Sequence, residues 1–205
     1  MQEKWIYWAT MLQSIAQAGL TFTENSYDLD RYRKIRELSL EIMQEYTGIS
    51  HKKLEGLFAG ETGYQTPKTD IRSAVFRDDK ILLVREKIDG AWSMPGGWAD
   101  VNSTPSESAI RECLEEAGAV VIPERIVAIH VASLHNNPIT PYTIYKIFFE
   151  CKLIETRFAE NTETLAAGFF QLDNLPPLST DRTTKAQIEM CFNARKLELI
   201  EPYFD

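Results

Sequence analysis

GGWADVNSTPSESAIRECLEEAGA, the stretch from Gly96 to Ala119, decides how this chain folds and what it does. Thr104 is a helix N-cap residue, Pro105 suits the first helical position, and Glu107 lies at the spacing of a capping box. Gly118 is a natural residue to end the helix, because glycine adopts the left-handed conformation readily. We therefore predict a helix of about three and a half turns between Thr104 and Gly118.

Three glutamates share one side of this predicted helix. Glu112 and Glu116 are four residues apart, and Glu112 and Glu115 are three apart, so we expect their carboxylates to stack. Like charges so close repel each other, and a divalent cation between them would remove the repulsion. Mg²⁺ and Mn²⁺ prefer such hard oxygen ligands. The alternative is a solvated helix face on which Arg111 forms an ordinary surface pair with Glu115.

The same stretch resembles the box of the Nudix hydrolase family, GX5EX7REUXEEXGU, in which U is an apolar residue. The matching positions are Gly97, Arg111, Glu112, Cys113, Glu115, Glu116, Gly118 and Ala119. One position departs, because Ser103 stands where the box has a glutamate. This departure bears on the number or affinity of the metal ions and on the ion-pair support of Arg111.

The resemblance implies a metal-dependent hydrolase in which a metal-activated water attacks a nucleoside diphosphate linked to another group X. A diphosphate repels nucleophiles, so its catalyst must neutralise charge and position a water. The family pattern implies Glu112 and Glu116 as catalytic metal ligands, Glu115 as a further ligand and the Gly96 carbonyl as a partner of Mg²⁺ or Mn²⁺. Arg111 is expected to orient these carboxylates rather than to contact substrate.

The resemblance places the general base either in the box itself or in a later loop, here within RFAENTETLAAGFFQL, residues 157–172. Glu160 and Glu163 are the candidates. Glu163 is preferred, because its spacing to the strand-like stretch at 166–172 resembles that of a late glutamate in the family. A solvated loop carboxylate remains the alternative, since only reach to the attacking water decides the role.

Composition limits the class of protein. The 205 residues can form one good core and a smaller appendage, and no apolar run approaches the roughly 20 residues of a membrane span. The start of the chain lacks the features of a secretory signal, so a cytoplasmic protein is expected. The formal net charge of −8 disfavours duplex nucleic acid as a partner. Cys113, Cys151 and Cys191 are expected to be buried or incidental thiols.

The pattern of apolar residues changes near residue 66. Residues 1–65 read as a small helical domain, in which Trp5, Trp8, Leu12 and Ile15 recur at helical spacing. Residues 66–205 read as the hydrolase domain, and strands are expected at 71–76, 80–85, 126–133, 142–154 and 166–172. A final helix from about 180–184 is expected to carry Ile188, Phe192 and Leu197 toward the core. The fold class is therefore α+β, and the resemblance implies an α/β/α sandwich with a mixed sheet.

The helical extension resembles a subgroup of Nudix proteins described as ADP-ribose or CDP-choline pyrophosphatases. That resemblance implies a homodimer and a nucleotide substrate, with cleavage of ADP-ribose to AMP and ribose 5-phosphate preferred. CDP-choline or another CDP-alcohol is the close alternative, and trimming of RNA 3′ ends with the same site is a weaker one. A ligand sensor that kept the fold without the chemistry is the non-enzymatic alternative, although Glu112, Glu115 and Glu116 argue against it.

Overall fold

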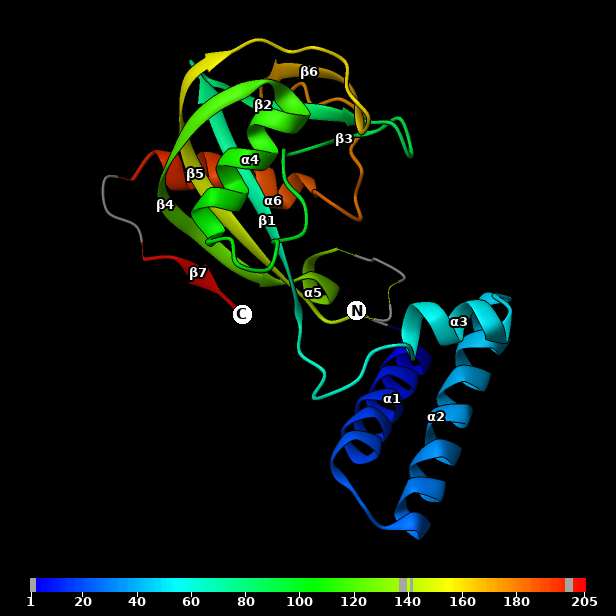
Figure 1. Ribbon diagram of the computed structural model, residues 1–205. Coiled ribbons are helices and arrows are strands. Elements are labelled where there is room, and N and C mark those ends of the chain that lie inside the picture. The colour runs from blue at the N-terminus through cyan, green and yellow to red at the C-terminus, as the bar shows by residue number, and fades with distance from the viewer. Residues whose placement is uncertain (1–2, 137–139, 141, 198–200) are drawn as a thin grey trace. The chain divides into compact units, whose positions relative to one another are not determined.

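The computed structural model describes residues 3–136, 140, 142–197 and 201–205, which divide into two compact units (Figure 1). One unit holds the described residues up to Pro67 together with those of the segment 139–143. The other holds the remaining described residues. Each unit has its own cluster of buried apolar side chains, so each is described by itself.

The first unit is helical, as predicted. It contains α1 (Lys4–Phe22), α2 (Ser26–Thr47) and α3 (His51–Phe58), with α1 and α2 side by side (Figure 1). The Asn25 side chain accepts hydrogen bonds from two backbone N–H groups at the start of α2, which satisfies donors that a helix leaves free. Local capping therefore sets where α2 begins.

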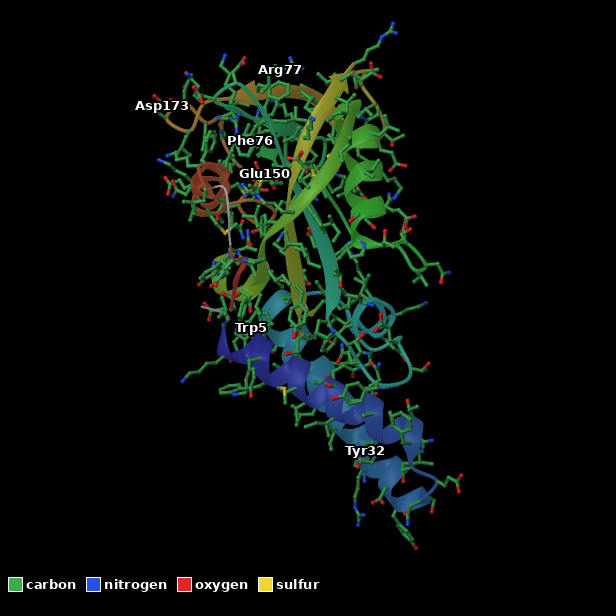
Figure 2. The ribbon with its side chains drawn as sticks, turned by 90° about the vertical axis from the view of Figure 1, so that its left-hand side faces the viewer. Trp5, Tyr32, Phe76, Arg77, Glu150 and Asp173 are labelled. Carbon is green, nitrogen blue, oxygen red and sulfur yellow. The ribbon has the colours of Figure 1, made fainter. Side chains whose placement is uncertain are left out.

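The apolar residues that recur at helical spacing on α1 are only partly buried within this unit. Trp8 and Ile15 are 53% and 48% exposed, and the buried side chains of α1 lie on a neighbouring face. That buried face is made by Ile6, Ala9, Gln13, Ala16 and Gln17. Both sets recur at spacings of three and four, so periodicity alone does not select the face that packs on α2. Trp5, labelled in Figure 2, is half-buried and stacks on Tyr46 of α2 with ring centroids 5.0 Å apart.

The second unit is built on a mixed sheet. Its strands follow the order β3-β2-β1-β5-β4-β7, and β6 pairs with β2. The pairing of β1 with β5 is parallel, whereas β5 pairs with β4 antiparallel. The elements are β1 (Lys68–Arg77), β2 (Lys80–Glu86), β3 (Trp92–Ser93), α4 (Pro105–Ala117), β4 (Ala119–Val131), α5 (Ala132–His135), β5 (Ile144–Thr156), β6 (Thr164–Phe170), α6 (Lys185–Arg195) and β7 (Tyr203–Phe204).

The two faces of this sheet are covered by different helices. Alternate residues of a strand point to opposite faces, and in β1 the side chains of Ile71 and Val75 pack in one cluster with Ala109 of α4. Ala74 packs in the other cluster, with Ile188 of α6. Figure 1 shows α4 and α6 on opposite sides of the sheet. The predicted α/β/α sandwich with a mixed sheet is confirmed.

Some predicted boundaries in this unit need correction. Ser133 lies in the short helix α5 rather than in a strand, and β5 starts after residue 143. Leu197 lies beyond the end of α6 and is 55% exposed, so it does not enter the core. Phe192 does pack inward, where its ring meets Phe76 edge-on at 5.1 Å; Figure 2 labels Phe76. β4 begins at Ala119, well before the predicted start at residue 126, because its pairing with β5 continues through that segment. Tertiary pairing therefore decides where these strands begin and end.

Two further expectations concern the chain as a whole. The three cysteines are buried and unpaired, as predicted. Within the ranges that the structure describes, no helix combines the length and the apolar character needed to cross a bilayer.

Candidate active site

Helix α4 carries the central carboxylates, and its two ends are fixed locally. The Thr104 side chain accepts a 3.2 Å hydrogen bond from the Glu107 N–H, and the Glu107 carboxylate accepts one of 2.8 Å from the Thr104 N–H. This is the predicted capping box. Gly118 ends the helix at φ +57°, where a Cβ would lie 2.2 Å from the Arg157 carbonyl oxygen. These contacts fix where the helix begins and ends, and Ala109, Cys113 and Ala117 then pack it against the sheet.

The three glutamates of α4 do not share one environment. Glu112 and Glu116 are 6% and 5% exposed, whereas the Glu115 side chain is 60% exposed. Successive helix residues are rotated by roughly 100°, so Glu115 lies a quarter-turn away from Glu116 although both neighbour Glu112. The structure brings Glu112 and Glu116 together on the buried face and leaves Glu115 at the surface.

The loop before α4 contacts its last turn through Gly96. The Gly96 N–H donates a 2.8 Å hydrogen bond to Oε2 of Glu116. Gly96 has φ +147°, and a Cβ at this position would lie 1.9 Å from the carbonyl oxygen of Ile71. Only glycine fits so close to β1. The resemblance pointed to the carbonyl of Gly96, and the structure adds its N–H as a contact of Glu116.

Arg111 is held among three carboxylates. Its guanidinium lies 2.9 Å from Glu112, 3.1 Å from Glu115 and 3.1 Å from Asp100. Asp100 was not singled out by sequence reasoning, because its role depends on the turn in which Ser103 N–H donates to the Asp100 carbonyl. Asp100, three positions before Ser103, thus supplies Arg111 with an acidic partner.

Burial governs the protonation of the two inner carboxylates. It raises the pKa of Glu116 to about 8, while the positive charge of Arg72 and the Gly96 N–H oppose the rise. Burial is also the main reason that the pKa of Glu112 is raised, with Arg111 acting in the opposite direction. Because burial disfavours their charged forms, Glu112 and Glu116 bind protons readily unless a cation lies nearby.

A buried ion cluster beside the site was missed from the sequence. Arg72 on β1 donates to both carboxylate oxygens of Asp70, at 2.7 and 3.0 Å, and Lys146 on β5 lies 3.3 Å from Asp70. Burial lowers the pKa of Lys146 to about 8. The available signal was a pair of opposite charges two residues apart, Asp70 and Arg72, because alternate residues of a strand share a face. The cluster places the fixed positive charge of Arg72 close enough to act on Glu116.

The two candidate bases lie differently in the loop after β5. Glu160 is paired with Lys87 at 3.1 Å. The exposed side chain of Glu163 lies near the helix, since its negative charge is among the causes that raise the pKa of Glu112. The negative charge of Glu163 therefore acts on Glu112, whereas Glu160 is engaged by Lys87.

The donor chemistry of the buried face fits a divalent cation. Glu112 and Glu116 present carboxylates whose charged form is disfavoured by burial, and a cation would reverse that effect. Among the described side chains, however, no three His, Cys, Asp or Glu residues are already grouped to hold a metal ion. Glu115 is engaged by Arg111, so its predicted part in a ligand set requires that pair to open.

Comparison with known families matches both units of the chain. A model described as "NUDIX domain" matches residues 67–190. A second, described as "UDP-X-like, N-terminal oligomerisation domain", matches residues 3–58. The second model therefore matches the helical unit, and the first matches the unit that contains the sheet.

Individual relatives extend over most of the chain. The Bacillus subtilis protein named "Putative ADP-ribose pyrophosphatase YjhB" is 42% identical over 193 residues, covering 94% of this chain and 93% of its own. The crystal structure of an ADP-ribose pyrophosphatase from Streptococcus suis is 44% identical with a TM-score of 0.64, covering 68% of this chain and 100% of that one. The crystal structure of a UDP-X diphosphatase is 31% identical with a TM-score of 0.64, covering 98% of both chains.

Proposed function

Because this chain belongs to the Nudix hydrolase family, we propose that it hydrolyses the diphosphate bond of ADP-ribose to give AMP and ribose 5-phosphate. The observation that carries the proposal is the pair of buried carboxylates, Glu112 and Glu116, on the face of α4 that the family box predicts. The choice of ADP-ribose is supported by the Bacillus subtilis and Streptococcus suis relatives, which carry that substrate in their names.

The proposed cofactor is Mg²⁺ or Mn²⁺, held by Glu112 and Glu116 with the carbonyl of Gly96, and by Glu115 where Arg111 releases it. A bound cation of this kind neutralises diphosphate oxygens and lowers the pKa of a bound water. Arg111 fixes the orientation of the Glu112 carboxylate through their 2.9 Å ion pair. Glu163 accepts a proton as the water oxygen bonds to phosphorus and the phosphorus–oxygen bond of the leaving phosphate breaks.

A second candidate substrate is a uridine diphosphate linked to X. It is favoured by the diphosphatase structure that covers 98% of this chain and by the description of the helical family model. CDP-choline gains no support from the relatives named above. Trimming of RNA ends is disfavoured by the net charge of −8, which offers little attraction to a phosphate backbone. A sensor without chemistry does not fit an enzyme family.

We infer further that residues 1–65 form the oligomerisation domain of a homodimer and residues 66–205 the catalytic domain. The inference is supported by the description of the family model that matches residues 3–58. Within the helical unit, α1 exposes large apolar side chains along one stripe, comprising Tyr7, Trp8, Met11 and Ile15. An apolar stripe of this kind marks a surface that binds another protein.

The test is turnover across a substrate panel of ADP-ribose, UDP-sugars, CDP-choline and dinucleotide polyphosphates, with Mg²⁺ and then Mn²⁺. Products are detected as phosphate released by an added phosphatase. We expect metal-dependent turnover that is highest with ADP-ribose. The Glu116→Gln protein, purified identically, is the control for contaminating phosphatases. Preference for a UDP-sugar would select the second candidate, and silence with every substrate would reject the proposed function.

A further inference from the structure

The loop that carries Glu163 is held mainly by hydrogen bonds. Its residues Arg157, Ala159 and Glu160 are exposed, and it borders a groove of about 410 Å³ against the end of α4. Apart from the half-buried Phe158, the loop therefore has little apolar packing to fix its course. Whatever determines the position of the Glu163 carboxylate must act through specific polar contacts.

Asn161 makes those contacts in both directions. Its Nδ2 donates to the carbonyl oxygens of Glu115, at 2.9 Å, and Glu116, at 3.4 Å, in the last turn of α4. Its Oδ1 accepts from the backbone N–H groups of Glu163 and Thr164, each at 2.9 Å. The Asn161 carboxamide thus links the last turn of α4 to the backbone at Glu163.

Two neighbours complete the attachment. Thr164 is fully buried, and its hydroxyl donates a 2.7 Å hydrogen bond to the Glu116 carbonyl while accepting one of 2.7 Å from Asn161. On the other side, the Lys87 N–H donates to the Glu163 carbonyl at 2.9 Å, and the Lys87 ammonium donates to the Asn161 carbonyl at 2.6 Å. The last carbonyl oxygens of a helix accept no hydrogen bond within the helix. Here Asn161 and Thr164 donate to them.

We propose that Asn161 is a positioning residue that sets where the Glu163 carboxylate lies relative to Glu112, by docking the loop backbone onto the last turn of α4. The inference rests on the proposed role of Glu163 as the base. In this proposal Asn161 acts through the position of Glu163. A small displacement of a catalytic group lowers the chemical rate steeply while leaving substrate affinity nearly unchanged.

A double-mutant cycle on the full chain tests this, with ADP-ribose and Mg²⁺ as reactants. The variants are Asn161→Ala, Glu163→Gln and both together, with Asn193→Ala, an exposed asparagine of α6, as the matched control. We expect Asn161→Ala to lower kcat by about tenfold or more with KM within about twofold. In the Glu163→Gln background, the same substitution should have almost no further effect, since coupled residues are non-additive.

Failure of the positioning role and failure of Glu163 as the base give different results. A normal kcat in Asn161→Ala, or a full tenfold further loss in the Glu163→Gln background, would overturn the positioning role. A normal kcat in Glu163→Gln would instead reject Glu163 as the base and with it the proposed mechanism. If Asn161→Ala does not fold, the cycle is run with Asn161→Asp, which keeps the acceptor oxygen but removes the donor to the α4 carbonyls. The same outcomes then decide.

Discussion

The backbone N–H of Gly96 and the carboxylate of Glu116 are joined by a 2.8 Å hydrogen bond. This contact ties the loop before α4 to the last turn of that helix, 20 residues later. It favours the charged carboxylate, yet burial is stronger and raises the pKa of Glu116 to about 8. At neutral pH and without a cation, Glu116 is therefore largely protonated.

Glu116→Gln should consequently be tolerated by the fold while removing activity. Glutamine keeps the volume and an acceptor oxygen for the Gly96 N–H, and it resembles the protonated acid. We expect turnover on ADP-ribose to fall by at least about a hundredfold, the scale for a key electrostatic group. In thermal unfolding, the variant should match the wild type without metal but lose the stabilisation given by Mg²⁺. Near-normal turnover in a folded variant would contradict the metal assignment.

A second prediction concerns the acidic partner of Arg111. Asp100→Ala should lower kcat by several-fold, because Arg111 then lacks its 3.1 Å contact on the loop side and orients Glu112 less well. Adding Ser103→Glu to Asp100→Ala should restore most of the loss, since it returns the acid found in the family box. Steady-state kinetics with a Mg²⁺ titration measure both effects. Equal activity of the single and double variants would show that Ser103 is peripheral.

Thr104→Ala tests how far the capping box stabilises α4. Loss of the side-chain acceptor for the Glu107 N–H should lower the free energy of unfolding by about 1 kcal/mol. Thr184→Ala is the matched control, because Thr184 forms the same box with Gln187 at the start of α6. Urea unfolding should show similar losses for both. An unchanged midpoint for Thr104→Ala would mean that the packing of α4 on the sheet defines the helix without its cap.

His130 makes the stability of the catalytic unit sensitive to acid. It is 3% exposed, and burial together with His135 lowers its pKa to about 4 from the usual 6.5. Between these values the unfolded chain binds more protons than the folded one, so stability falls as the pH drops from 6.5 toward 4. His130→Phe should remove on the order of 2 kcal/mol of that decline. Thermal unfolding across this pH range measures it, and an unaltered decline would contradict the assignment.

The ends of α4 and its cap were predictable because their causes are local. Thr104, Glu107 and Gly118 act on backbone groups a few residues away, so their spacing in the sequence carries the information. The buried positions of Glu112 and Glu116 follow from the same helix. The surface position of Glu115 agrees with the alternative of a surface pair with Arg111 rather than with the expected stack of three carboxylates. A carboxylate three residues away is a neighbour on the helix without facing the same side.

The remaining parts of the site depend on contacts between distant segments. Arg72 and Asp100 act on the charged groups of α4 only after the sheet and the turn are assembled. Asn161 reaches backbone carbonyls in the last turn of α4 only once the late loop is in place. The apolar face of α1 is a similar case, because two faces fit helical spacing and packing on α2 selects the one with smaller residues. The larger side chains of the other face are left exposed.

That exposed stripe gives the last prediction. Tyr7, Trp8 and Met11 are 54%, 53% and 44% exposed on α1, and such a surface in water is stabilised by covering it with a second copy. Light scattering at micromolar concentration should give twice 23.5 kDa for the wild type. Met11→Glu should give the monomer mass, because burying the new carboxylate in an apolar interface is costly.

A charge-changing substitution elsewhere in the helical unit tests whether loss of the dimer is specific to the α1 stripe. Arg33→Glu on α2 alters an exposed residue that is already polar, and it should leave the dimer mass unchanged. A dimer that survives Met11→Glu would place the interface away from the α1 stripe. A monomeric wild type with full turnover on ADP-ribose would show that the catalytic unit works without a second copy, and the dimer proposal would then fail while the hydrolase proposal stands.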